Sequence, residues 1–177
     1  MDAVAAEPLP RALRLIETVL DGLSRLCLLL TGIALVVLTV IFGWLVFGRY
    51  VLNATPTWVE QAAFLLVMMI AFLGAAIGVR ENTHLSVSLF RDALPRKAQL
   101  VVLGVTDLLM GLFGALMFWF GGQLTLFKWG SLIPLIQVPE GLRSLPLTVG
   151  GGLILLFSLG HLVRLVTGTD RRATPAA

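Results

Sequence analysis

The chain has 177 residues, of which 58% are hydrophobic and 13% are charged, and its mean hydropathy is +0.95. Soluble domains carry about 25% charged residues, so this composition excludes an ordinary water-soluble domain and indicates an integral membrane protein. The net charge of +3 comes without a basic patch interleaved with aromatic residues, which argues against nucleic acid as a partner. A single cysteine, Cys27, excludes an internal disulfide.

The N-terminal region contains an amphipathic segment before the first long apolar run. Asp2 and Glu7 precede any apolar run, which is atypical of a cleavable signal peptide, so we expect the first span to be retained. In residues 11–25, apolar residues recur near one helical face and charged residues lie largely opposite. We expect an N-terminal amphipathic helix over residues 11–25 that lies in the membrane interface. The alternative is a solvated extension of the first crossing.

Four apolar stretches are each long enough to cross a bilayer as a helix, at a rise of ~1.5 Å per residue. They cover residues 26–48, 58–79, 98–127 and 145–166. The polar loop between the second and third stretches contains a short amphipathic segment. The predicted fold class is therefore all-α integral membrane, with four transmembrane helices in a single membrane domain.

Basic residues gather in three of the five segments outside the spans, which sets the expected orientation. Ten of the 13 lysines and arginines are Arg11, Arg14, Arg25, Arg80, Arg91, Arg96, Lys97, Arg164, Arg171 and Arg172. These lie in the N-terminal segment, the middle loop and the C-terminal tail, which alternate with the loops that hold the other three. The positive-inside rule then places both termini and the middle loop in the cytoplasm.

Glu60 lies just inside one end of the second span, and Arg49 ends the first span on the same side. A short loop makes the two helices antiparallel neighbours, so we expect Glu60 to pair with Arg49 or with a partner subunit. A proton-binding or substrate-binding role for Glu60 is the alternative. If the two side chains pair, reversing both charges together retains more transport than either single reversal.

Asp107 is the most deeply placed acid. It follows Lys97 by ten residues, or ~15 Å along the helix, where a carboxylate must face protein or water rather than lipid. The expected partners are Thr106, His161 or a polar group of another subunit. Ion coupling is the alternative, but a proton relay needs a chain of such groups.

Small residues form a stripe along the second span, at Ala71, Gly74, Ala75 and Gly78. Such stripes let helix backbones approach closely in lipid, where hydrophobic drive between helices is absent. Packing within this chain and packing against another protein would use the same chemistry. The three glycines at 150–152 likewise predict tight packing of the fourth span.

Catalytic and cofactor-binding patterns are missing from the sequence. It has no glycine-rich phosphate loop, no nucleophile motif and no His-Glu-x-x-His motif, so we predict no enzymatic activity. A haem or metal site between the two histidines, His84 and His161, would have no cysteine or third ligand nearby. We therefore expect no metal and no cofactor.

Short motifs follow one another in a fixed order from the end of the first span to the middle loop. They are Arg49-Tyr50, Trp58-Val59-Glu60-Gln61, Phe72-Leu73-Gly74-Ala75, Arg80-Glu81-Asn82-Thr83-His84-Leu85-Ser86-Val87 and Leu94-Pro95. This ordered set resembles the small permease subunit of tripartite ATP-independent periplasmic (TRAP) transporters, the DctQ type. The sequence departs from that family's pattern at Gln61, where a second acid is common, and at Met68 and Ser88.

The resemblance implies a non-catalytic subunit of the bacterial inner membrane that binds and steadies a large permease subunit of the DctM type. In that family the large subunit moves substrate and sodium, and a separate periplasmic protein of the DctP type delivers an organic acid. Membrane lipid is the other expected partner. We expect Arg80 and His84 to fix the geometry of the middle loop. The candidates for structural or partner-interface roles are Arg49, Tyr50, Trp58, Glu60, Gly74, Gly78, Arg80, His84 and Asp107.

Two other functional classes are alternatives, and the first of them also has four spans. A stand-alone, small multidrug-type proton-coupled exporter is shorter and carries its acid in the first span, whereas Glu60 and Asp107 lie in the second and third. A haem-bearing membrane anchor subunit would use the two histidines. Transport by the isolated chain would favour the exporter, and a Soret band would favour the anchor.

Overall fold

The computed structural model describes residues 11–54, 56–81, 96–133 and 137–167. Its helices are α1 (Arg11–Tyr50), α2 (Trp58–Glu81), α4 (Arg96–Phe127), the short 3-10 helix η1 (Glu140–Arg143) and α5 (Leu145–Val166). Within the described ranges, four helices are long and apolar enough to cross a membrane. The predicted all-α fold with four membrane-spanning helices is confirmed, and the predicted spans match α2, α4 and α5 to within two residues at each end.

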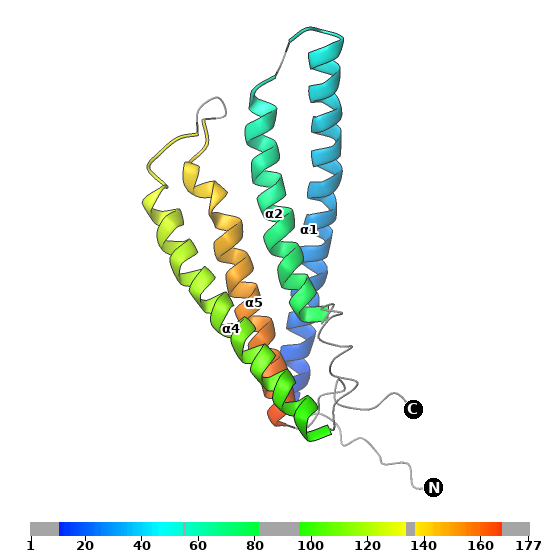
Figure 1. Ribbon diagram of the computed structural model, residues 1–177, viewed down its shortest axis with the longest axis vertical. Helices are drawn as coiled ribbons and strands as arrows, with labels where there is room; N and C mark the ends of the chain where they lie inside the picture. The colour runs from blue at the N-terminus through cyan, green and yellow to red at the C-terminus, as the bar shows by residue number, and fades with distance from the viewer. Residues whose placement is uncertain (1–10, 55, 82–95, 134–136, 168–177) are drawn as a thin grey trace, which may run out of the picture.

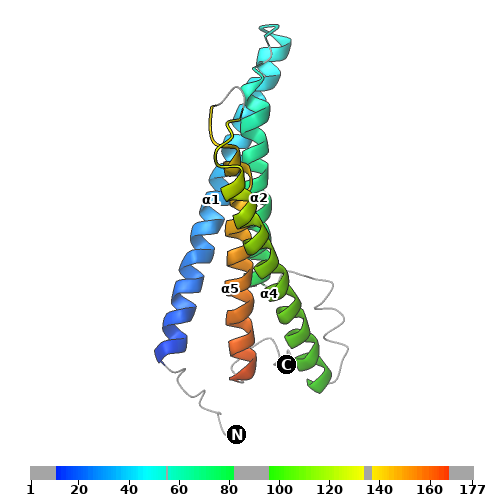
Figure 2. The ribbon, with the colours of Figure 1, turned by 90° about the vertical axis from the view of Figure 1, so that its left-hand side faces the viewer.

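The helices pack in the spatial order α1, α2, α5, α4. Helix α2 contacts both α1 and α5, and the most extensive contact in the molecule is between α4 and α5. The start of α1 and the end of α5 lie at one end of the bundle, which we call the terminal end (Figure 1). The connection between α1 and α2 lies at the opposite end, which we call the turn end. Figure 2 shows α1, α5 and α4 spreading apart toward the terminal end.

Helix α1 is a single helix of 40 residues. At ~1.5 Å per residue its length is about 60 Å, twice the ~30 Å of a bilayer's hydrocarbon core. The predicted boundary near residue 25 is absent, because no proline interrupts the helical hydrogen bonds there and Gly22 is tolerated in the helix. The structure therefore favours residues 11–25 as an extension of the first span, and their position in the membrane interface stays a prediction. The amphipathic segment predicted in the middle loop lies outside the described residues.

The buried core joins α1, α2 and α5 in the half of the bundle nearer the terminal end. Its members are Leu20, Cys27, Leu73, Ala76, Ile77, Val79, Leu153, Ile154 and Phe157. The Phe157 side chain is fully buried at the centre of these three helices. Because lipid is as apolar as these side chains, close packing rather than exclusion of water holds them together.

Glycines bring the backbones of α4 and α5 into contact. A Cβ atom on Gly151 would lie 2.6 Å from the Phe118 nitrogen, and one on Gly114 would lie 2.7 Å from the Leu155 nitrogen. On the other side of α5, a Cβ atom on Gly150 would lie 2.8 Å from the Cβ of Phe72 in α2. Only glycine fits at these positions, which agrees with the tight packing predicted for residues 150–152.

The connection between α1 and α2 at the turn end is short and closely folded. The Ala54 nitrogen donates to the Gly48 carbonyl oxygen at 3.0 Å, and a Cβ atom on Gly48 would lie 3.0 Å from the Ala54 carbonyl oxygen. Asn53 adopts a positive φ of 50°, a conformation that asparagine tolerates better than most residues. This turn fixes α1 and α2 as antiparallel neighbours.

The connection between α4 and α5 folds back onto the end of α4. The Ile133 nitrogen donates to the Val138 carbonyl oxygen at 2.8 Å, and the Gly141 nitrogen donates to the Lys128 carbonyl oxygen at 3.2 Å. The Ile133 side chain is fully buried. These contacts hold η1 against the ends of α2 and α4, where its charged residues can reach both helices.

Candidate functional site

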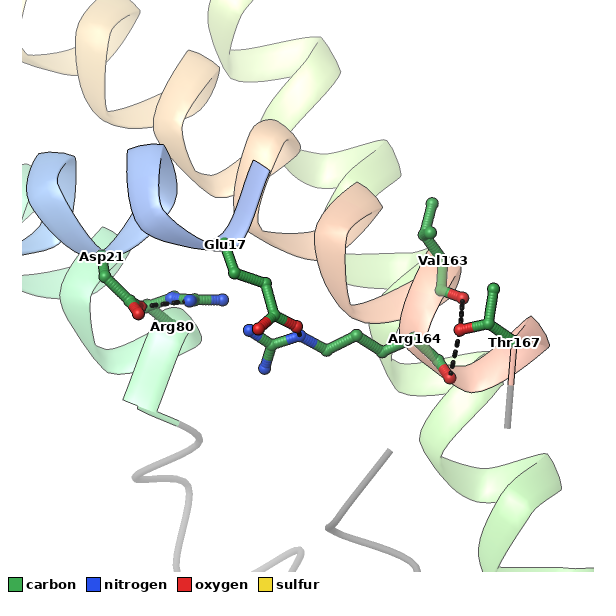
Figure 3. Close-up of polar contacts among 6 residues, drawn as sticks. All are labelled: Glu17, Asp21, Arg80, Val163, Arg164 and Thr167. Atoms are coloured by element: carbon green, nitrogen blue, oxygen red, sulfur yellow. Dashed lines mark hydrogen bonds and ion pairs between the residues drawn. The ribbon is translucent and has the colours of Figure 1, made fainter. Parts of the chain in front are cut away.

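Two ion pairs join three helices at the terminal end (Figure 3). Arg80, in the last turn of α2, pairs with Asp21 of α1. Arg164, in the last turn of α5, donates from its Nε atom to Glu17 of α1 at 2.8 Å. Glu17 and Asp21 are four residues apart and therefore share one face of α1. Two acids on one face of α1 therefore form ion pairs with the arginines at the ends of α2 and α5.

Arg80 is the more deeply placed of the two arginines. Its side chain is only 7% exposed, and its guanidinium lies over the ring of Phe157 at 6.0 Å. One of its nitrogens, Nη1, is shielded from water and has no hydrogen-bond partner among the described residues. Arg80 therefore fastens α2 to α1. Its predicted role in the middle loop remains a prediction, because His84 lies outside the described residues.

Asp107 and His161 form a buried polar pair between α4 and α5. The Oδ1 atom of Asp107 lies 3.5 Å from the Nδ1 atom of His161, and the two residues are 5% and 1% exposed. The acid faces protein, with one of its three predicted partners. The described residues contain no group of three or more histidine, cysteine, aspartate or glutamate side chains that could hold a metal ion.

Arg143 connects η1 to α2 at the turn end. Its Nη2 atom donates to Oε1 of Gln61, and its guanidinium lies over the ring of Phe64 at 5.3 Å. Lys128 and Glu140, nearby, are joined by an ion pair at 2.8 Å. Sequence reasoning treated Gln61 only as a departure from the family pattern, and the structure shows that its side chain is the acceptor for Arg143.

The structure does not pair Arg49 with Glu60. Both side chains are exposed at the turn end, and no ion pair joins them in the part of the chain that the structure describes. Ion pairs between exposed side chains contribute little to stability in any case. Tyr50 and Trp58, the aromatic residues beside them, are also exposed. Roles for these four residues at an interface stay predictions.

The small-residue stripe of α2 faces mostly away from the rest of the bundle. Ala71 and Ala75 are exposed, Gly78 is half-buried, and a Cβ atom on Gly74 would meet nothing within 4 Å. This contrasts with the glycines of the α4–α5 contact, where backbone atoms fill the same space. The close packing that the stripe predicts is therefore not made at Gly74 within this chain.

Comparisons with known proteins agree with this architecture. Residues 38–168 match the family model of the DctQ component of tripartite ATP-independent periplasmic transporters. The chain is 27% identical over 88 residues to the sialic acid TRAP transporter small permease protein SiaQ of Vibrio cholerae, covering 50% of this chain and 49% of that protein. It is also 27% identical over 121 residues to a putative TRAP transporter small permease protein of Haemophilus influenzae, covering 67% and 73%.

The chain thus spans about half the length of the V. cholerae relative. The family model covers about the last third of α1 and all of α2, α4 and α5. The matched region includes the polar pairs Asp107–His161 and Arg143–Gln61, but not the acidic residues of α1 at the terminal end. On the strength of the matched region and its four apolar helices, the chain belongs to the DctQ component family, the small permease subunits of TRAP transporters.

Proposed function

We propose that this small permease subunit binds the large permease subunit of a TRAP transporter and holds it in the bacterial inner membrane. The transporter takes up an organic acid, which a periplasmic binding protein delivers. A sodium gradient drives this uptake. Family membership supports this proposal, and one relative is named as part of a sialic acid transporter. Membership in this family does not favour the exporter or the haem-anchor alternatives.

Open glycines on the outer faces of α1 and α2 are the observation that carries the scaffold role. Cβ atoms added to Gly32, Gly43 and Gly74 would meet nothing within 4 Å. Glycine inside a helix costs about 1 kcal/mol relative to alanine, and at these positions no contact within the chain offsets that cost. Small residues on a lipid-exposed face are typical of sites where another helix approaches closely.

The open glycines of α1 lie on one face of a helix that the rest of the chain barely covers. Gly32 and Gly43 are eleven residues apart, close to three full helical turns, so both point in nearly the same direction. Around Gly32 this face of α1 is an open, shallow apolar surface that includes Leu28, Leu29 and Val36. We propose this face of α1 as the principal contact with the large subunit.

Positively charged residues give the proposed orientation. The described arginines at the terminal end include Arg25, Arg80 and Arg164, and the sequence adds further basic residues to the segments beyond them. By the positive-inside rule the terminal end lies in the cytoplasm. The turn end, with η1, then faces the periplasm, where the proposed binding protein would dock.

Co-purification tests the scaffold role. A tagged subunit is expressed together with an untagged large TRAP permease subunit, and the recovered permease is quantified. Substituting both Gly32→Leu and Gly43→Leu should lower recovery by about tenfold or more, since side chains in the contact prevent close approach of helices. The thermal stability of the isolated subunit should not fall, because both positions are open.

Leu109→Trp is the matched control for this experiment. It adds bulk at a similarly exposed position on the outer face of α4, away from α1. Recovery of the permease should be unchanged in this variant. Full recovery in the double glycine variant would show that this face of α1 does not contact the large subunit.

A further inference from the structure

Two hollows adjoin at the terminal end of the bundle. A polar hollow of about 420 Å³ is lined by Asp21, Ser24, Arg25, Arg80, Glu81 and Arg164. An apolar hollow of about 220 Å³ lies between α1 and α5, and its walls include Leu20, Leu159 and Val163. Arg164 lines both hollows, so the apolar one opens beside the polar one. A charged compartment next to an apolar groove matches the two halves of an amphiphile.

The polar hollow contains a hydrogen-bond donor that needs an acceptor. The Nη2 atom of Arg80 donates to Asp21. The Nη1 atom is shielded from water and has no partner among the described residues. The side chain is more than nine-tenths buried, and Phe157 covers one face of the guanidinium. A buried donor on a charged group is costly to leave unpaired. The described residues do not supply an acceptor for Nη1, so we expect a bound molecule to supply one.

The donors left over around the hollow favour an anionic acceptor. Three arginines and two acids line it, and Arg80 is engaged by Asp21 while Arg164 is engaged by Glu17. The Nη1 atom of Arg80 and the Arg25 guanidinium are therefore the donors that remain. Arg25 is exposed and forms no ion pair within the described residues. A phosphate oxygen suits this setting, because guanidinium groups bind phosphate through paired N–H donors.

We propose that the terminal end binds one membrane phospholipid. Its phosphodiester occupies the polar hollow, where it accepts from Nη1 of Arg80 and lies near Arg25. One acyl chain follows the groove between α1 and α5, over Leu159. The groove is what selects a lipid over inorganic phosphate or a partner's carboxylate, since neither of those has an apolar part to fill it. This lipid would add contacts among α1, α2 and α5 where the three helices meet. The proposal does not rest on the scaffold function proposed above.

Native mass spectrometry of the full chain in detergent, titrated with phosphatidylglycerol, tests the proposal. Arg80→Gln should weaken lipid binding by about tenfold or more, since it removes a hydrogen bond to a charged group. Asp21→Asn is the matched control, because it breaks the same ion pair but leaves the arginine in place. It should bind lipid at least as tightly as the unmodified chain.

A second pair of variants tests the groove. Leu159→Trp fills the path of the acyl chain from an exposed position and should weaken binding several-fold, whereas Leu109→Trp on α4 should not. Inorganic phosphate should not displace the lipid at equal concentration. If Arg80→Gln fails to fold by circular dichroism, Arg25→Gln replaces it, since Arg25 is exposed and holds no ion pair within the described residues.

Three results would overturn the proposal. Equal loss in Arg80→Gln and Asp21→Asn would mean that the ion pair only supports the fold. Displacement of the lipid by inorganic phosphate, with no effect of Leu159→Trp, would mean a site for a free anion. Loss of the bound lipid when the large permease co-purifies, with a crosslink from Arg25→Cys to that permease, would mean that a partner side chain fills the hollow.

Discussion

Replacing Gly151 by alanine tests the close packing of α4 against α5. The added Cβ atom would lie 2.6 Å from the Phe118 nitrogen, 2.7 Å from the Met117 Cβ and 3.0 Å from the Gly114 carbonyl oxygen. Ordinary contacts of a Cβ atom begin near 3.4 Å. Two of the three neighbours are backbone atoms that cannot rotate away, so the two helices must move apart.

The cost follows from two opposing effects. Forcing extra atoms into a closely packed contact costs about 1–3 kcal/mol, and a clash with backbone falls in the upper part of that range. Alanine recovers up to about 1 kcal/mol of helix propensity relative to glycine. The net loss in the free energy of unfolding is therefore about 1–2 kcal/mol, or roughly 2–8 °C in melting temperature for a chain of this size.

The assay is thermal unfolding of the full chain in detergent, followed by circular dichroism. Gly74→Ala is the matched control, because it makes the same change inside a helix where nothing lies within 4 Å of the new Cβ atom. Its melting temperature should stay the same or rise. Equal stability of Gly151→Ala and Gly74→Ala would refute the close contact between α4 and α5 at this position.

Two further predictions concern the polar pairs. Gln61→Glu should raise the free energy of unfolding by roughly 1 kcal/mol, since a hydrogen bond from Arg143 to a carboxylate is stronger than one to an amide. The gain should vanish in an Arg143→Met background, and a gain that persists there would place its origin elsewhere. Asp107→Leu should lower stability by about 1–3 kcal/mol because it leaves His161 buried without its carboxylate. Adding His161→Leu should restore part of this loss, and additive losses in the two single variants would show that the side chains do not interact.

The ends of the spans could be read from the sequence because local chemistry sets them. Trp58 and Leu145 follow turn-forming residues, and each begins a helix where predicted. The start of the first span was not found, because the amphipathic pattern of residues 11–25 is compatible with either a separate helix or a continuous one. Only the geometry of α1, which runs unbroken from Arg11 to Tyr50, distinguishes the two.

One polar pair could be predicted from the sequence, and two others could not. Asp107 had few possible partners, because a carboxylate deep in a span must meet one of a small number of polar groups, and His161 was among those named. Arg80 and Asp21 are 59 residues apart, and Arg143 and Gln61 are 82 apart. At the ends of the helices many charged partners are available, so sequence spacing alone does not choose among them.

Hydropathy, charge and short motifs, all of which are local properties, were enough to determine a four-helix membrane protein and its family. The short loop predicted the contact between the first two spans, but the place of α5 between α2 and α4 was decided by the tertiary structure. The physical reason is that helices in lipid associate through the fit of their surfaces rather than through hydrophobicity. That fit uses Gly114 and Gly151 and leaves Gly74 open, although all three glycines lie within apolar helices. It also brings Arg80 against α1, where Arg80 lines the polar hollow together with residues of α1 and with Arg164 of α5.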